Sequence, residues 1–213
     1  MKRIVPLFVL CGLLIIWSVS CEAVTPSPNT TPNWWSSWLD EPVCKLPCWQ
    51  NITPGVTTLK EAKSILENLP YIKSQTKTHN SIDWRFSPNK DDGGWLEASQ
   101  DGIVRSITLG GDSEILLQTI TTSYGDPKYV KPHDCRDGVC PTLLIYPDLG
   151  LWVSVFVENT NGDNEDPHIE ILPTMVSNRV IFMKSGMENA KKELSLFQDD
   201  RLTMEWKGYG EYP

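Results

Sequence analysis

The sequence is short of histidine and of basic residues, and both shortages restrict what the protein can do. It has only 3 histidines, and its 19 lysines and arginines stand against 27 acidic residues, for a net charge of −8. Affinity for nucleic acid comes mostly from basic side chains on phosphates, so we expect no nucleic-acid partner. Electrostatic adhesion to anionic lipid is disfavoured for the same reason. A partner protein would match this charge best with basic patches.

The usual signatures of catalysis are also missing. The sequence contains no G-x-S-x-G, no H-E-x-x-H and no phosphate-binding loop. The three histidines, His79, His133 and His168, stand alone in polar, turn-like contexts, where a surface position is more common than the role of a general base. The acidic run 161–166 lacks the spacing of a calcium loop and is typical of a solvated turn. We therefore expect no catalytic residue, no metal site, no cofactor and no enzymatic activity.

No apolar run is long enough to cross a membrane comfortably. The run at residues 4–17 is shorter than the roughly 20 apolar residues that a transmembrane helix needs. Lys2 and Arg3 precede it, and small residues follow it. A basic start, a short apolar core and a small-residue exit predict a secretory signal peptide over residues 1–20.

The end of this segment, Ser18-Val19-Ser20-Cys21, resembles a bacterial lipobox, although Ser18 stands where most such boxes have leucine. The resemblance implies a lipoprotein whose lipidated Cys21 becomes the first mature residue and anchors the chain outside the cytoplasm. Several acyl chains on one cysteine attach durably, whereas one chain alone binds marginally. Ordinary cleavage near Ser20 or Ala23, or an uncleaved anchor, are the alternatives.

Residues 21–37 predict a tether. After the cysteine they read EAVTPSPNTTPNWWSS, rich in proline, serine, threonine and asparagine, with no hydrophobic periodicity. Such segments stay extended and cannot bury a core. Trp34, Trp35 and Trp38 close the segment. They either lie at the lipid interface, where indole is favoured, or begin the folded domain.

Four cysteines remain after Cys11 of the signal and Cys21 are set aside: Cys44, Cys48, Cys135 and Cys140. An even number in an oxidising compartment predicts two disulfides. Local pairing is favoured because each neighbouring pair flanks turn-forming residues, while long-range pairing would constrain the unfolded chain more. Neither pair has the C-x-x-C spacing typical of redox or zinc motifs.

Residues 38–213 predict an α+β fold, in which an antiparallel sheet has its helices packed on one side. The stretch 55–69 carries a helical stripe that begins with the capping box Thr58 to Glu61 and ends at Pro70. Short alternating segments follow, and Asp101-Gly102 marks a hairpin.

The order of helix and strands then recurs. A second helix is expected from Glu114 to Tyr124, capped by Asp112 or Ser113, and strands follow it. We interpret this as a possible degenerate tandem repeat, with one α+β unit at 38–111 and another at 112–213.

A third helix is expected at 185–197. The glycine pairs Gly93-Gly94 and Gly110-Gly111 are expected in turns.

Short motifs support this interpretation. Ile52-Thr53-Pro54-Gly55-Val56-Thr57, followed by the capped helix, resembles the opening of small envelope lipoproteins related to the β-barrel assembly machinery. It is similar also to the tandem modules of the β-lactamase inhibitory protein, as is Gly125-Asp126-Pro127 after the second helix. The segment 42–49 resembles the cysteine-bearing opening of other bacterial lipoproteins. These resemblances imply a sheet face used for protein contacts.

Two functions follow from these features. The first is a membrane-tethered, non-enzymatic binding module for another envelope protein. The second is a carbohydrate- or cell-wall-binding lipoprotein that uses exposed tryptophans. Trp84, Trp95 and Trp152 fall in predicted strands and could form one binding face, although a core position for at least two of them is the simpler expectation.

The lipobox resemblance yields a first prediction. A fatty-acid analogue supplied to the producing cells should label the protein, because the anchor is covalent. Cys21→Ser should abolish the label and release the chain from the membrane, whereas Cys11→Ser should change neither. A Cys21→Ser chain that remains labelled and membrane-bound would contradict the anchor.

Overall fold

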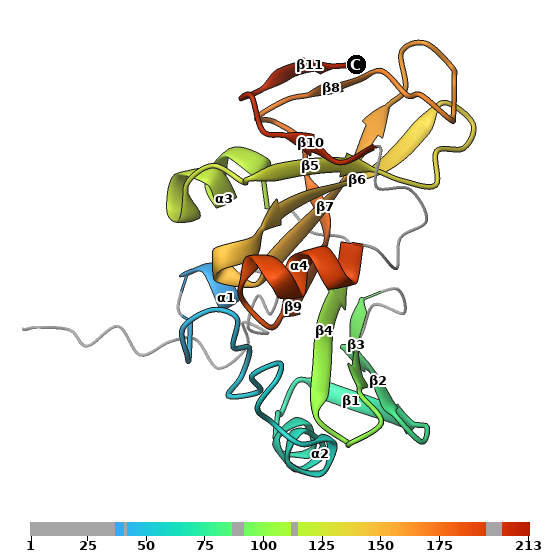
Figure 1. Ribbon diagram of the computed structural model, residues 1–213. Coiled ribbons are helices and arrows are strands. Elements are labelled where there is room, and N and C mark those ends of the chain that lie inside the picture. Colours follow the sequence, from blue (N-terminus) through green and yellow to red (C-terminus); the bar gives the residue numbers. More distant parts are fainter. Residues whose placement is uncertain (1–36, 41, 87–91, 112–114, 195–201) are drawn as a thin grey trace, which may run out of the picture. The chain divides into compact units, whose positions relative to one another are not determined.

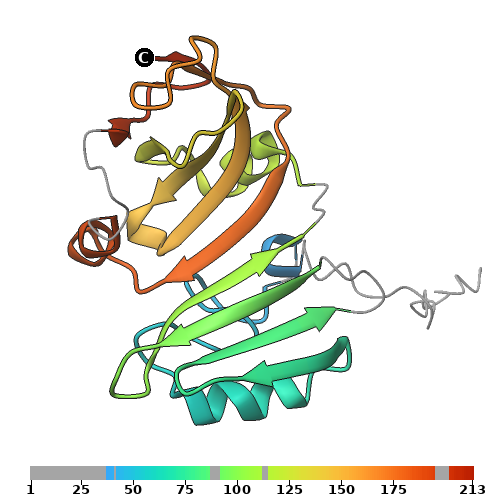
Figure 2. The ribbon, with the colours of Figure 1, turned by 90° about the vertical axis from the view of Figure 1, so that its right-hand side faces the viewer.

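The computed structural model describes residues 37–40, 42–86, 92–111, 115–194 and 202–213, and the chain from Thr31 onward forms one compact unit. A nine-stranded sheet lies at its centre, and every neighbouring pair of strands runs antiparallel (Figures 1 and 2). The predicted α+β class with an antiparallel sheet is confirmed. No helix among these described ranges is long and apolar enough to span a membrane.

The first half of the chain builds one end of the sheet. Its elements are α1 (Ser37–Asp40), α2 (Leu59–Glu67), β1 (Ile72–Lys77), β2 (Ser81–Phe86), β3 (Gly93–Ala98) and β4 (Val104–Gly110). The four strands form a meander in chain order.

The second half contributes the other strands and two further helices. Its elements are α3 (Leu117–Tyr124), β5 (Tyr129–Pro132), β6 (Val139–Tyr146), the 3-10 helix η1 (Pro147–Leu149), β7 (Leu151–Glu158), β8 (Ile169–Ile171), β9 (Ser177–Met183), α4 (Met187–Leu194), β10 (Met204–Glu205) and β11 (Gly210–Tyr212). The order across the large sheet is β1-β2-β3-β4-β9-β7-β6-β5-β10, and β8 pairs with β11 in a separate small sheet. Strand β9 therefore joins the two halves through β4.

Helix α2 forms as the sequence predicts. The Thr58 hydroxyl accepts a hydrogen bond from the Glu61 N–H at 3.2 Å, and the Glu61 carboxylate accepts one from the Thr58 N–H at 2.8 Å. The hydrogen bond from the Thr58 N–H, together with a second one that the Thr58 hydroxyl donates to the same carboxylate, lowers the pKa of Glu61. Leu59, Ala62 and Leu66 are buried and form the predicted stripe.

Helix α3 begins at Leu117, three residues later than Glu114, so that part of the prediction is wrong. The carbonyl of Ile115 accepts a hydrogen bond from the Ser177 N–H at 2.9 Å, and the Leu117 N–H donates to Met175 at 2.7 Å. The Ile115 carbonyl is thus paired with the first residue of β9 and is not available to a helical N–H, and the backbone of Leu116 is extended. Asp112 and Ser113 lie outside the described residues, as does Phe197 at the end of the expected third helix.

The main core lies on one face of the sheet, where α1, α2 and α3 cover it. Trp84 of β2 stacks on Trp49, with ring centroids 5.5 Å apart and 10° between the planes. Leu144 and Val153 continue the same core into the second half. We call this the first face.

The expectation that all helices pack on one side is wrong, because α4 lies on the opposite, second face. Ala190 and Leu194 of α4 pack on Leu143, Ile145 and Trp152, a separate cluster. Helix α4 can pack there because β6 and β7 carry buried apolar side chains on both faces of the sheet. Strand β7 lies inside the sheet, between β6 and β9, as is typical of a strand that is apolar on both faces.

Both disulfides form with the predicted local pairing. Cys44 bonds to Cys48, and Cys135 bonds to Cys140 in the turn between β5 and β6. The glycine pairs behave differently from expectation: Gly93 and Gly94 begin β3, and Gly110 ends β4. These three glycines lie in strands rather than turns, each paired in register with a residue of a neighbouring strand, while Gly111 lies in a bend just after β4.

The strand glycines yield a stability prediction with a built-in control. A Cβ on Gly94 would lie 2.4 Å from Cζ2 of Trp84, whereas a Cβ on Gly110 would meet only Cζ3 of Trp95, at 3.9 Å. Gly94→Ala should therefore lower the free energy of unfolding by about 1–3 kcal/mol, as overpacking does. Gly110→Ala should leave it unchanged or raise it by up to about 1 kcal/mol. Urea unfolding measures both, and equal values would contradict the packing of Trp84 on Gly94.

Candidate functional site

The second face of the sheet is covered unevenly. Helix α4 packs over β6, β7 and β9, while the second-face side chains of β2, among them Asp83 and Arg85, are exposed. Trp95 of β3 is half-buried on the same face. An open area therefore lies beside α4, at the end of the sheet built by the first half of the chain (Figure 1).

A groove of about 240 Å³ crosses this open area. In the strand register Arg85 is opposite Gly93, Gly93 is opposite Gly110, and Gly110 is opposite Arg179. One row across four strands thus reads Arg-Gly-Gly-Arg. The two glycines form the floor, and the arginines stand at the two ends.

Three of the four glycines at the groove are required by packing. Besides the Trp84 ring against Gly94, a Cβ on Gly93 would lie 2.4 Å from the Trp84 carbonyl oxygen, and one on Gly111 would lie 2.1 Å from Oδ1 of Asp92. Gly111 also has φ of 144°, which side-chain-bearing residues rarely adopt. Gly110 has no such contact, so a side chain could be accommodated there.

Trp95 and Arg179 form one wall of the groove. The Arg179 guanidinium carbon lies 5.2 Å from the centre of the Trp95 ring, within the range of a cation–π interaction. Partial burial lowers the pKa of Arg179. The guanidinium still keeps its charge at neutral pH, because arginine titrates far above it.

His133 follows β5 directly, and the charge of Arg179 acts on it. Burial lowers the pKa of His133, Asp134 opposes that shift, and the charges of Arg179 and Lys131 add to it. The imidazole Nδ1 is 3.4 Å from Oδ2 of Asp134. Lys131 projects from the register position opposite Leu143 and is itself buried. This region is therefore rich in positive charge within an acidic protein.

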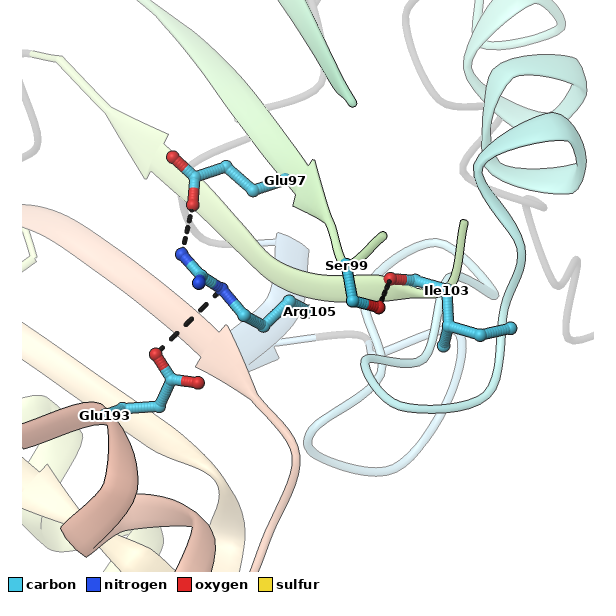
Figure 3. Close-up of polar contacts among 5 residues, drawn as sticks. All are labelled: Glu97, Ser99, Ile103, Arg105 and Glu193. Carbon is cyan, nitrogen blue, oxygen red and sulfur yellow. Dashed lines mark hydrogen bonds and ion pairs between the residues drawn. The ribbon is translucent and has the colours of Figure 1, made fainter. Parts of the chain in front are cut away.

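A second hollow, of about 350 Å³, lies between α4 and the turn that joins β3 to β4. Figure 3 shows Arg105 at its side, reaching Glu97 on the neighbouring strand and Glu193 on α4, the latter at 3.9 Å. The Ser99 hydroxyl donates to the Ile103 carbonyl at 2.9 Å and closes the turn. These polar contacts hold α4 over β4, although exposed ion pairs of this kind stabilise a protein only slightly.

The simpler expectation for the three strand tryptophans, a core position for at least two of them, is confirmed, and the three do not form one exposed row. Trp84 and Trp152 are each 1% exposed, and they lie on opposite faces of the sheet. Because side chains alternate between the two faces along β2 and β7, Trp84 points into the main core and Trp152 into the cluster under α4. Of these three tryptophans only Trp95 is accessible, and it lies in the groove. Cys21, the proposed lipid site, lies outside the described residues.

The acidic run 161–166 is an exposed turn, in which side chains form hydrogen bonds with backbone groups of the same run. Nδ2 of Asn161 donates to the Asp166 carbonyl at 2.8 Å, and Oδ1 of Asp163 accepts from the Glu165 N–H at 2.9 Å. Across the described residues no group of three or more His, Cys, Asp or Glu side chains could hold a metal ion.

The residues of the groove could not be picked out from the sequence. Gly93 and Gly110 were expected in turns, and Arg85 and Arg179 looked like ordinary strand residues. The one available signal was the position of each glycine pair at the end of an alternating segment, where glycine in a strand often marks a close approach.

Comparisons with protein-family models, with curated proteins and with solved structures give no match for this chain.

The charges around His133 yield a prediction on its titration. The NMR midpoint of the His133 imidazole should lie below that of an ordinary histidine, because burial and the nearby cations disfavour its charged form. Arg179→Gln should raise this midpoint, since it removes one of those cations. Arg85→Gln, the same change at the other end of the groove, should leave it in place. A midpoint that does not respond to Arg179→Gln would contradict their proximity.

Proposed function

We propose that this chain is a membrane-tethered extracytoplasmic lipoprotein that acts as a non-enzymatic protein-binding module of the cell envelope. The observation that carries the proposal is the open second face of the sheet, which combines an accessible groove with an apolar patch. The lipid on Cys21 and the tether at 21–37 would hold this face at a distance from the bilayer.

The apolar patch lies at the far end of β6 and β7. Phe156 is 59% exposed, and Val139 is 40% exposed. Phe156 is opposite the half-buried Pro141 and lies on the same side of β7 as Trp152, so it belongs to the second face. An exposed aromatic side chain on a strand is a typical anchor of a protein interface.

The strand order also supports a degenerate tandem repeat. Helix α2 is followed by four strands of the sheet, β1 to β4, and α3 is followed by β5, β6, β7 and β9. The two sets lie in reverse order about the β4–β9 pair. The resemblance to the tandem modules of the β-lactamase inhibitory protein implies a sheet face used for protein contacts.

The carbohydrate-binding alternative has less support. It required a row of accessible indoles, and only Trp95 remains accessible among the three. One face of that ring is taken by the Arg179 guanidinium. In the groove a sugar would therefore find little aromatic surface on which to stack.

Site-specific photo-crosslinking in native membranes tests the proposal. A photoreactive residue at Phe156 or at Asp83 should capture the same partner protein, because both positions are exposed on the second face. The matched control is Lys60, an exposed position on α2 that faces away from the sheet. Equal capture from Lys60 would contradict binding through the second face. Substrate turnover that a single substitution abolishes would contradict the non-enzymatic part.

A further inference from the structure

We propose that the groove receives a carboxylate side chain from an acidic segment of the partner protein, held between Arg85 and Arg179. The inference rests on the proposed function and assigns the chemistry of one contact within it. It concerns a local site, and the net charge of the whole chain is a separate property.

The geometry leaves room for an incoming group between the two guanidinium ends. Gly93 and Gly110 place no side chain on the floor. The Arg85 side chain lies over Gly93, with its Cδ 3.2 Å and its Nη1 3.4 Å from where a Cβ would stand, so the uncovered part of the floor is at Gly110. Arg179 approaches from the other end against Trp95. A carboxylate in the groove would therefore be flanked by both arginines.

Gly110 is the informative residue of the floor. Its backbone does not require glycine, and a Cβ at this position would have its nearest neighbouring atom 3.9 Å away. Glycine in a strand weakens it relative to a residue with a side chain, so neither stability nor packing accounts for its presence here. An open floor for a bound group does account for it.

The charges of the groove favour an anion. Among the residues that the structure describes, its lining carries the two arginines and a single carboxylate, Asp83. Among the described residues, neither Arg85 nor Arg179 forms an ion pair with an acidic side chain. Asp92 lies behind Gly111, where it is buried and has a partner of its own. The planar fork of a guanidinium matches a carboxylate, and such charge-assisted hydrogen bonds are strong.

A peptide carboxylate fits better than that of an acidic sugar. A sugar acid would need an aromatic face for its ring, and Arg179 covers the accessible indole. The methylene groups of a glutamate can instead lie along the exposed edge of Trp95, while its carboxylate reaches the guanidinium groups.

The test uses the full lipoprotein in detergent and a fluorescent hexapeptide of glutamate with blocked ends, at about 0.15 M salt. Fluorescence anisotropy should show at least about tenfold tighter binding of this peptide than of the matching glutamine hexapeptide. Arg85→Gln and Arg179→Gln should each weaken binding about tenfold or more. Gly110→Val should block the groove and have a similar effect.

The control is Arg136→Gln, which removes the same charge from an exposed turn outside the groove and should not alter binding. Circular dichroism and urea unfolding of each variant separate a lost site from a lost fold. Glutamate-peptide binding that survives in folded Arg85→Gln and Arg179→Gln would overturn the assignment. So would the absence of such binding, or tighter, arginine-dependent binding of a glucuronate oligosaccharide.

The photo-crosslinks at Phe156 distinguish this inference from the proposed function. Crosslinks that persist in a protein that does not bind the glutamate peptide would overturn the groove assignment alone. Peptide binding that persists without any second-face crosslink would overturn the proposed function of the face.

Discussion

The pairing of β4 with β9 is the contact on which the rest of the structure depends. It joins the four-strand meander of the first half to the strands of the second half, so that both share one sheet and one main core. It also sets the register that brings Gly110 opposite Arg179. A shift of one residue would turn every side chain of β9 to the other face, removing Val180 and Phe182 from the core and Arg179 from the groove.

The uneven covering of the two sheet faces explains where a binding surface can lie. On the first face α1, α2 and α3 pack on a continuous apolar core. On the second face only the central strands are apolar enough to bury α4, and the side chains of β2 and β3 are polar or half-buried. Helix α4 therefore covers the second face where the sheet is apolar, at the central strands. The open area beside it combines a groove, two arginines and an accessible indole.

Charge is organised on two length scales in this protein. The chain as a whole is strongly acidic, which governs its long-range approach to other molecules. The groove has the opposite local character, because Arg85 and Arg179 both line it. A partner can thus be attracted through basic patches on its surface and still insert one acidic side chain. At contact distance the local pairs decide the geometry.

The sequence by itself determined the features that short-range physics controls. The capping box of Thr58 and Glu61, the Asp101-Gly102 turn and the two local disulfides each involve residues a few positions apart, so neighbouring side chains suffice to specify them. Tertiary structure alone decided the start of α3, the face on which α4 packs, the burial of Trp84 and Trp152, and the groove. Each of these depends on which distant strand lies alongside. The Ser177 N–H donates a hydrogen bond to the Ile115 carbonyl, for example, and Arg179 is paired in register with Gly110. Alternation along one strand shows that two faces differ, but only packing against the rest of the chain decides which of them is buried.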